Sequence, residues 1–363
     1  MSTHLNTKLV QLGNRQDPTT GAVVAPIHLA TTYAHPGLGQ STGYDYTRTK
    51  NPTREILEHG LADLEGGVKA VVTSSGMSAV QLAFQVFNPG SHFLVSRDLY
   101  GGSFRYFEHL EAQGYSRFSY FESEEDLEKI ITDEVDGIFI ETPTNPLMKE
   151  VDIQRIADLS HRHDALLLVD NTLLTPLRQR PLDLGADIVI HSGTKYLTGH
   201  NDILAGVVVT NNQKIGEKLS WLSNTTGPTL SPFDCWLFIR SLKTLPVRID
   251  RQEKTAREIV TWLKQQTQIK EVLYAGKGAM ISIRLKNEQA VGPFLERLAL
   301  FTYAESLGGV ESLITYPTTQ THADIPKSLR ESYGLTPDLL RLSVGLEDVD
   351  DLIQDLKVAL KVK

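Results

Sequence analysis

The sequence predicts an α/β fold, in which a mostly parallel sheet is covered by helices on both faces and a smaller α+β domain follows. Between Thr53 and about residue 210, short apolar runs rich in valine and isoleucine alternate with longer segments of helical period. Strands that are buried on both faces need such near-continuous apolar runs, and amphipathic helices supply the crossovers between them. After about Asn224 the pattern becomes mixed, which indicates a second, smaller unit.

Six segments are predicted to form strands of the large sheet, and apolar spacing predicts the helices between them. Residues 53–64 place Leu57, Leu61 and Leu64 on one helix face, and residues 152–163 show the same period. The predicted strands are 70–74, 93–96, 137–141, 166–170, 187–191 and 205–209.

The chain is predicted to divide into an N-terminal arm at 1–52, a large domain at 53–228 and a small C-terminal domain at 229–363. The arm is rich in Gly, Thr and Pro and poor in helical period, so we expect an extended arm rather than a packed element. Its three tyrosines argue against a disordered tail, because such tails are usually poor in aromatic residues. The segment TGPTLSPFD marks the second boundary. The small domain is expected to contain helices at 252–266 and 348–360 and strands at 280–285 and 339–344.

Composition limits the partners that the protein can have. Lys plus Arg total 36 against 44 for Asp plus Glu, and this net charge of −8 argues against nucleic acid or an anionic membrane surface as the main partner. The single cysteine, Cys235, excludes an internal disulfide framework and a Cys-only zinc site. His161 and His163 stand at a polar helix end without clustered acidic partners, so no metal is expected. No apolar run is long enough for a signal core or a membrane span, which predicts a soluble cytoplasmic protein.

A lysine with two neighbouring hydroxyls stands directly after a predicted strand, in the segment Ser192-Gly193-Thr194-Lys195. Ligands of parallel α/β sheets bind at the carboxyl ends of the strands. A lone lysine there is ordinarily a solvated surface charge, but these two hydroxyls suit a phosphate, and an earlier strand ends at Asp170. The combination favours a phosphate-bearing cofactor.

A pyridoxal phosphate site needs an amine to form a Schiff base, a carboxylate to keep the pyridine nitrogen protonated, donors for the phosphate and an aromatic ring to stack. Each group is present in a loop after a predicted strand. Each is weak evidence alone, but together and in this order they are specific. They are Lys195 for the amine, Asp170 for the carboxylate, the backbone N–H groups of the helix-opening turn at Gly76 and Met77, and Tyr100 for the ring.

Six motifs run along the chain in order: VVTSSGMSA, DLYGG, ETPTNP, VDNT, HSGTKYLTGH and AESLGGVES. They resemble the Cys/Met-metabolism, or trans-sulfuration, family of PLP-dependent enzymes, and the resemblance covers essentially the whole chain. It implies the fold type I architecture of PLP-dependent transferases, with an arm, a mostly parallel seven-stranded sheet in a large cofactor domain, and a smaller α+β domain. The match is closest to the branch that holds cystathionine γ-synthase and O-acetylhomoserine thiol-lyase, with cystathionine γ-lyase as near kin.

The resemblance implies roles for the cofactor residues. Lys195 would hold pyridoxal 5′-phosphate and shuttle protons, Asp170 would pair with the pyridine nitrogen, and Tyr100 would stack on the ring. The phosphate would be bound by the amides of Gly76 and Met77 and the hydroxyls of Ser192 and Thr194.

The arm also acquires a function from the resemblance. In this family the Tyr and Arg of a Y-x-R arm motif reach the phosphate in a neighbouring subunit, and here they would be Tyr46 and Arg48. The resemblance therefore implies active sites shared across a dimer interface, within a homotetramer.

The substrate residues come from the C-terminal part and from one loop of the large domain. Arg341, inside the apolar run LRLSVG, matches the arginine that binds the α-carboxylate of the amino-acid substrate, a role suited to a guanidinium fork. Asn145 and Ser306 would lie beside it. Glu305 matches the acidic position that is associated with chemistry at Cγ.

These residues imply γ-replacement on an O-acylhomoserine, giving cystathionine with cysteine or homocysteine with sulfide. The alternatives are γ-elimination by a cystathionine or homocysteine γ-lyase, and a non-enzymatic α/β binding protein that keeps the fold. Two departures from the family pattern affect the substrate side: Thr49 replaces an arginine that many synthases carry, and the segment 274–280 is shorter than usual. The acyl group and the thiol stay open.

Overall fold

The computed structural model describes residues 3–361, and its largest element is a seven-stranded sheet with the strand order β1-β7-β6-β5-β4-β2-β3. Strand β7 runs antiparallel to both of its neighbours, and the other strands run parallel to one another. The expected mostly parallel seven-stranded sheet is confirmed. The strands are β1 (Lys69–Thr73), β2 (Ser91–Ser96), β3 (Ser116–Phe121), β4 (Gly137–Glu141), β5 (Leu166–Asp170), β6 (Ile188–Ser192) and β7 (Gly206–Thr210).

Strand β3 is the one member of this sheet that the sequence pattern did not predict. It lies at the edge of the sheet, and its sequence SRFSYF buries Phe118 and Phe121 while Arg117 is exposed. An edge strand that is partly open to solvent does not need a continuous apolar run, so the pattern that identified the central strands is missing here.

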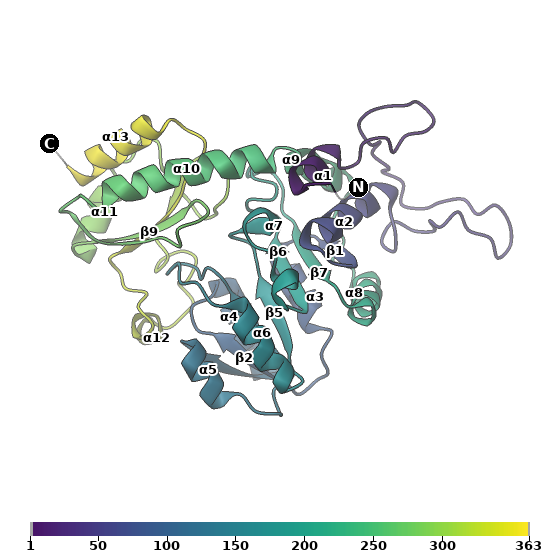
Figure 1. Ribbon diagram of the computed structural model, residues 1–363, viewed down its shortest axis with the longest axis horizontal. Coiled ribbons are helices and arrows are strands. Elements are labelled where there is room, and N and C mark those ends of the chain that lie inside the picture. Colours follow the sequence, from purple (N-terminus) through teal and green to yellow (C-terminus); the bar gives the residue numbers. More distant parts are fainter. Residues whose placement is uncertain (1–2, 362–363) are drawn as a thin grey trace.

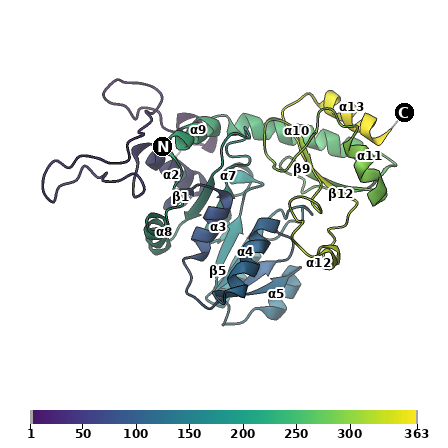
Figure 2. The same ribbon diagram turned by 180° about the vertical axis from the view of Figure 1, so that it is seen from behind.

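Helices cover both faces of the sheet, because neighbouring residues of the central strands point to opposite sides. Val169 and Val189 belong to the apolar cluster on one face, whereas Leu168 and Ile188 belong to the cluster on the other. Helix α6 stands in front of the sheet in Figure 1, and α3 and α4 stand in front of it in the reverse view of Figure 2. One face carries α2 (Pro52–Glu65), α5 (Glu124–Ile130) and α6 (Ile153–Arg162), and the other carries α3 (Gly76–Phe84), α4 (Gly101–Ala112) and α8 (Gln213–Thr226).

A second sheet of five strands follows, in the order β10-β11-β12-β9-β8. The predicted strands at 280–285 and 339–344 form its centre as β9 and β12, and the closing helix 348–360 is present as α13. The strands are β8 (Ile269–Leu273), β9 (Met280–Leu285), β10 (Thr302–Tyr303), β11 (Leu313–Thr315) and β12 (Leu339–Ser343). The later helices are α11 (Val291–Leu295), α12 (Lys327–Ser332) and α13 (Val349–Leu360), and the short elements α7 (Thr175–Arg178), η1 (Pro181–Leu184) and η2 (Glu288–Ala290) lie in connections.

Helix α10 (Leu245–Leu263) begins seven residues before the predicted helix at 252–266. Pro246 is tolerated because it lies in the first turn, and Leu245 and Ile249 are buried. The helix follows α9 (Pro232–Leu242) and runs from beside α9 along the second sheet (Figure 1). The two sheets are therefore joined by a long helix, and the domain boundary at 228/229 stays a prediction.

The arm differs from the expectation at its start. Residues Leu5–Gln11 form helix α1, and Leu9 is buried in the apolar cluster that includes α2. The expectation that no part of the arm packs was therefore wrong. Leu5 and Leu9, one helical turn apart, pack in this cluster and dock the short helix. From Gln16 to Asn51 the chain forms turns, bends and one isolated bridge between Thr32 and Tyr46, and it extends away from the large sheet as long loops (Figure 1). Within residues 3–361, none of the helices combines the length and apolar composition that a bilayer span requires.

Candidate active site

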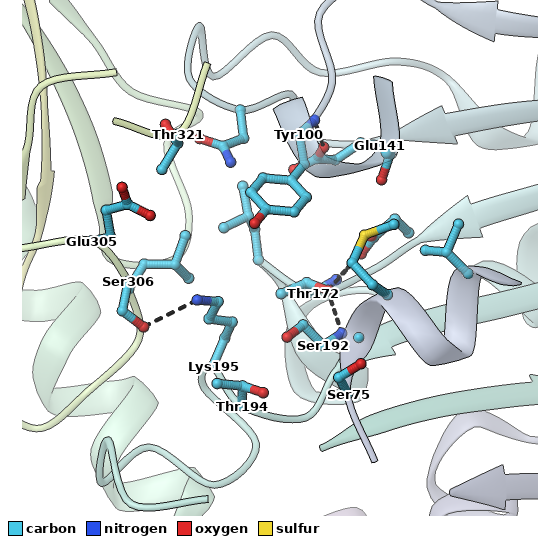
Figure 3. A pocket seen from close by; sticks show the side chains of 18 of the residues that line it. Ser75, Tyr100, Glu141, Thr172, Ser192, Thr194, Lys195, Glu305, Ser306 and Thr321 are labelled. Carbon is cyan, nitrogen blue, oxygen red and sulfur yellow. Dashed lines mark hydrogen bonds between the residues drawn. The ribbon is translucent and has the colours of Figure 1, made fainter. Parts of the chain in front are cut away.

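A cavity of about 350 Å³ lies where the carboxyl ends of the parallel strands meet the second sheet. Loops after β1, β2, β4, β5 and β6 supply one side, and residues after β10 and within β12 supply the other. Figure 3 shows Glu305, Ser306 and Thr321 on one side, with Ser75, Ser192 and Glu141 opposite. Eleven predicted site residues line the cavity: Gly76, Met77, Tyr100, Asn145, Asp170, Ser192, Thr194, Lys195, Glu305, Ser306 and Arg341.

Lys195 projects into the cavity from the loop after β6. Its Nζ donates a hydrogen bond to Ser306 Oγ at 3.0 Å (Figure 3). Burial lowers the pKa of the amine to about 8, and the charge of Arg341 acts in the same direction. A substantial fraction of this lysine is therefore neutral near pH 7–8, as a nucleophile or base requires.

Asp170 ends β5 and is held by Thr172, two residues further on. Its Oδ1 accepts hydrogen bonds from the Thr172 backbone N–H at 3.0 Å and from the Thr172 hydroxyl at 2.5 Å. Burial raises the pKa of Asp170, whereas the two bonds from Thr172 oppose that shift. A carboxylate that is short of solvent but fixed in place favours a cationic partner on its cavity side.

A cradle for an anion lies between the start of α3 and the end of β6. Ser75 caps α3 by accepting the Ser78 N–H at 3.1 Å, so the amides of Gly76 and Met77 have no intrahelical partner. A Cβ at Gly76 would stand 2.8 Å from the Cβ of Ser192, so only glycine allows this approach. Free amides at a helix N-terminus beside a serine hydroxyl suit a phosphate.

Tyr100 lies at the start of α4, directly after β2, with its ring in the cavity above Lys195 in the view of Figure 3. A Cβ at Gly102 would stand 2.4 Å from the ring carbon Cε1, so glycine at 102 gives the ring its place. The ring can therefore lie against a planar group bound between it and the sheet.

Arg341 reaches the cavity from β12 and is a buried cation. Its Nη1 donates to Asn145 Oδ1 at 2.8 Å, and its Nη2 donates to Ser306 O at 2.9 Å. Burial lowers the pKa of the guanidinium to about 10, and its Nε has no hydrogen-bond partner within residues 3–361. A buried guanidinium with an unused donor is matched to a carboxylate ligand.

The arm residues are the two predicted site residues that this cavity does not contain. The Arg48 guanidinium lies over the Tyr46 ring at 5.3 Å, and its Nε contacts Asn224 Oδ1 at 3.5 Å. Thr49 also donates to Asn224 Oδ1, at 2.9 Å. Tyr46 and Arg48 therefore do not serve the site of their own chain in this conformation, and their role toward a neighbouring subunit stays a prediction.

Several lining residues were missed by the sequence reasoning. Glu141 belongs to ETPTNP, but only Asn145 was taken from that motif, although Glu141 ends a strand at the same edge as Asp170. Thr321 lies in the long loop between β11 and α12, where no periodic signal exists. The lining residues that were not among the predicted site residues are Ser75, Val80, Ser103, Glu141, Thr172, Leu173, Leu204, Leu307 and Thr321.

The cavity fits pyridoxal phosphate. It combines a lysine of lowered pKa, a half-buried carboxyl group fixed by Thr172, a cradle that any Cβ at position 76 would fill, and an aromatic ring. These are the groups that this cofactor requires, and the guanidinium of Arg341 in the cavity wall provides a cation for the carboxylate of an amino acid.

Comparisons with known proteins agree with this reading. Residues 6–361 match the family described as Cys/Met metabolism PLP-dependent enzymes. A cystathionine gamma-synthase/O-acetylhomoserine (thiol)-lyase from Bacillus subtilis is 51% identical, covering 99% of this chain and 97% of the relative. A cystathionine gamma-synthase from Haemophilus influenzae is 50% identical, covering 97% of this chain and 96% of the relative.

A solved structure has a similar fold along nearly the whole chain. Cystathionine gamma synthase from Xanthomonas oryzae pv. oryzae, in complex with aminoacrylate and cysteine, matches with a TM-score of 0.97 and 38% identity, covering 99% of this chain and 98% of that one. Family, relatives and fold agree along nearly the whole length, and the chain therefore belongs to the Cys/Met metabolism family of PLP-dependent enzymes, with pyridoxal 5′-phosphate as its cofactor.

Proposed function

We propose that the protein catalyses γ-replacement on an O-acylhomoserine, with cysteine or sulfide as the incoming thiol. The carboxylate leaving group departs from Cγ, and the thiol sulfur forms a bond to the same carbon, giving cystathionine or homocysteine. The observation that carries this proposal is that Glu305 and Ser306 face the cofactor residues across one cavity, with Ser306 Oγ accepting a hydrogen bond from Lys195 Nζ. The names of the Bacillus subtilis and Haemophilus influenzae relatives support it.

Each proposed role follows from a feature of the site. The bound cofactor supplies an electron sink for the charge that develops when protons leave the substrate. Arg341, a cation that lines the cavity, holds the α-carboxylate, and Asn145 keeps the guanidinium oriented. Lys195, with a pKa of about 8, accepts the proton from Cα and then carries protons along the substrate within reach of Ser306.

Glu305 has a different position from the other acids of the site. It is exposed at the cavity edge and faces Lys195 across the space (Figure 3). A carboxylate there can attract the ammonium group of an incoming amino acid without being buried itself. We therefore assign it to the part of the substrate that lies furthest from the cofactor.

We also propose a homotetramer built from dimers with shared sites, and a cytoplasmic location. Tyr46 and Arg48 face away from the cavity of their own chain, and the arm exposes Val23, Leu29 and Leu38. Such apolar side chains on a protruding segment favour burial against another subunit. Light scattering after gel filtration is expected to give four times the mass of one chain.

Steady-state assays test the reaction. O-acetylhomoserine or O-succinylhomoserine is supplied with cysteine or sulfide, and cystathionine and homocysteine are measured by mass spectrometry. We expect cystathionine or homocysteine formation to exceed the breakdown of cystathionine supplied alone at equal concentration. Faster breakdown to cysteine and 2-oxobutyrate would instead establish a γ-lyase, and faster breakdown to homocysteine and pyruvate would establish a β-lyase. If the purified protein shows no visible absorption band of a bound cofactor, or if the band is unchanged in Lys195→Ala, every pyridoxal mechanism is contradicted.

A further inference from the structure

Glu141 is a buried carboxyl group inside the cavity that none of the roles above uses. It is the last residue of β4, its side chain is 5% exposed, and it lies beside Tyr100 (Figure 3). Its Oε2 accepts a hydrogen bond from the Tyr100 backbone N–H at 2.9 Å. The side chain that closes this part of the cavity therefore contacts the residue whose ring faces the cofactor position.

Glu141 is also the direct neighbour of Asp170. The two residues are register partners on the parallel strands β4 and β5, so their side chains leave the sheet on the same face. Two carboxyl groups in one buried site cannot both be charged without a large cost. One of the two must hold a proton when no cation lies between them.

The surroundings decide which of the two holds it. Asp170 accepts two hydrogen bonds from Thr172, an amide and a hydroxyl, and both stabilise its ionised form. Glu141 accepts one backbone N–H, and within residues 3–361 no ion pair accompanies it. Burial, together with the charge of Asp170, raises the pKa of Glu141 well above its ordinary value, although the charge of Arg341 acts in the opposite direction. The proton therefore belongs to Glu141 and the charge to Asp170.

The contact with Tyr100 does not need a charge. Tyr100 is the residue before the first turn of α4, and its N–H has no role in the helix itself. The carbonyl oxygen of a neutral carboxyl group accepts this N–H as a carboxylate does. The bond fixes the backbone that carries the ring, and Gly102 leaves room for the ring.

We propose that Glu141 is a positioning residue that acts as a neutral, hydrogen-bonding carboxyl group, holding Tyr100 over the cofactor ring while Asp170 keeps the negative charge. This inference rests on the roles proposed for Tyr100 and Asp170. It extends them by assigning one proton to one of two neighbouring acids and by giving Glu141 a function through Tyr100.

Three variants separate shape, acceptor and charge at this position. Glu141→Gln keeps the shape and the acceptor and is always neutral. Glu141→Leu keeps the approximate size but removes the acceptor, and Glu141→Asp keeps a carboxyl group but withdraws it by one methylene. We expect Glu141→Gln to keep kcat/KM and cofactor affinity within about 3-fold of the wild type, and Glu141→Leu to lose about 10- to 100-fold in both.

Infrared spectroscopy of the apoprotein tests directly whether Glu141 holds a proton. In the apoprotein at pH 7, the infrared carbonyl stretch of protonated carboxyl groups should be weaker in Glu141→Gln than in the wild type, and the difference spectrum should contain the band of Glu141. Other buried acids, such as Asp98, whose pKa burial raises to about 6, contribute to both spectra and cancel in the difference. Circular dichroism of the bound cofactor reports the ring geometry, and it should be wild-type in Glu141→Gln and altered in Glu141→Leu.

Glu111 provides a control, because it lies near the C-terminal end of α4, the helix that begins directly after Tyr100. Its Oε1 accepts the Phe118 backbone N–H at 3.1 Å, outside the cavity. Glu111→Leu should lower thermal stability without changing the dichroism of the bound cofactor or its affinity. A purely structural role for Glu141 predicts that Glu141→Leu behaves in the same way.

The outcomes are distinct. If Glu141→Gln is as impaired as Glu141→Leu, or if the infrared band is as strong in Glu141→Gln as in the wild type, the neutral role is wrong. If Glu141→Leu matches the wild type, no positioning role exists. If Glu141→Leu does not fold, the activity and cofactor affinity of Glu141→Gln and the infrared measurement still decide. A wild type that binds cofactor but does not form cystathionine or homocysteine rejects the proposed reaction alone.

Discussion

Arg341 Nη1 donates a hydrogen bond to Asn145 Oδ1 at 2.8 Å, and this contact joins the two sheets of the protein. Arg341 lies in β12 of the second sheet, whereas Asn145 follows β4 of the first. The guanidinium also donates to Thr315 Oγ1 at 3.1 Å and to the carbonyl of Ser306. The carboxylate position is therefore defined only when both sheets are in place.

Arg341→Lys is expected to raise KM for the amino-acid substrate about 100-fold, because an ammonium group cannot replace a fork that donates in several directions at once. Cofactor affinity should stay near the wild-type value, since Arg341 is not among the residues proposed to hold the cofactor. Steady-state kinetics and cofactor titration measure the two quantities. The neighbouring Arg284 on β9, which donates to Glu271 and Gly334, provides the control. Arg284→Lys should lower stability with little change in KM, and an equal KM effect in both variants would contradict the assignment.

Lys195→Met is expected to stabilise the apoprotein at pH 7. The folded chain lowers the pKa of this amine to about 8 from 10.5, so below pH 8 the folded state carries the cost of a buried charge. Between pH 8 and 10.5 the unfolded chain holds a proton that the folded chain lacks, so the wild type gains stability there as the pH rises. The difference between the two proteins should shrink across that range, by at most about 3 kcal/mol. Denaturant unfolding at pH 7, 9 and 10.5 measures it, and a constant difference would contradict the shift.

The cofactor side of the site could be predicted from the sequence because it depends on strand ends. Lys195, Asp170 and Tyr100 each follow a strand, and parallel strands bring their carboxyl ends to one edge. The place of Arg341 depends on how the second sheet packs against the first, so only the family resemblance indicated it. Glu141 was missed because its importance comes from its register with Asp170, which no local pattern contains.

The difference between local sequence pattern and tertiary packing also explains which elements of the fold were missed. The central strands and the amphipathic helices α2, α6 and α13 have strong periodic patterns and were found within a few residues, whereas α10 begins seven residues before its predicted start. Helix α1 and the edge strand β3 are short and half-exposed, so tertiary packing determines them rather than pattern.

His322→Gln is expected to flatten the loss of stability between pH 6.5 and about 4. The imidazole is fully buried, and its Nε2 lies 3.2 Å from the Leu99 carbonyl and 3.1 Å from the Asn145 carbonyl, so this nitrogen carries the hydrogen. Burial lowers the pKa of His322 to about 4. Between that value and 6.5 the unfolded chain binds a proton that the folded chain excludes, so stability falls as the pH falls.

The size of the effect is up to about 3 kcal/mol over that range. Denaturant unfolding at several pH values should show a smaller slope in His322→Gln than in the wild type. His59→Gln, at a histidine whose side chain is 76% exposed on α2, should keep the wild-type slope. Equal slopes in wild type and His322→Gln would mean that another group controls acid stability.

Arg48→Ala is expected to weaken cofactor retention although Lys195 of the same chain is intact, because the proposed phosphate contact crosses a subunit interface. In a mixed dimer of Arg48→Ala and Lys195→Ala subunits, one site combines an intact Lys195 with an intact Arg48 from the partner. Random pairing of equal amounts should restore roughly a quarter of the wild-type activity. Activity assays before and after subunit exchange measure this, with mixed dimers confirmed by mass spectrometry.

Arg341→Ala mixed with Lys195→Ala controls for complementation within one chain. Lys195 and Arg341 line the same cavity of one chain, so an active site needs one subunit in which both residues are intact. No mixed dimer contains such a subunit, and no activity should return. No recovery in the Arg48 mixture would place Arg48 outside a shared site and leave the exposed arm without its proposed role. Recovery in the Arg341 mixture would instead show that the Lys195 and Arg341 of one site come from different chains.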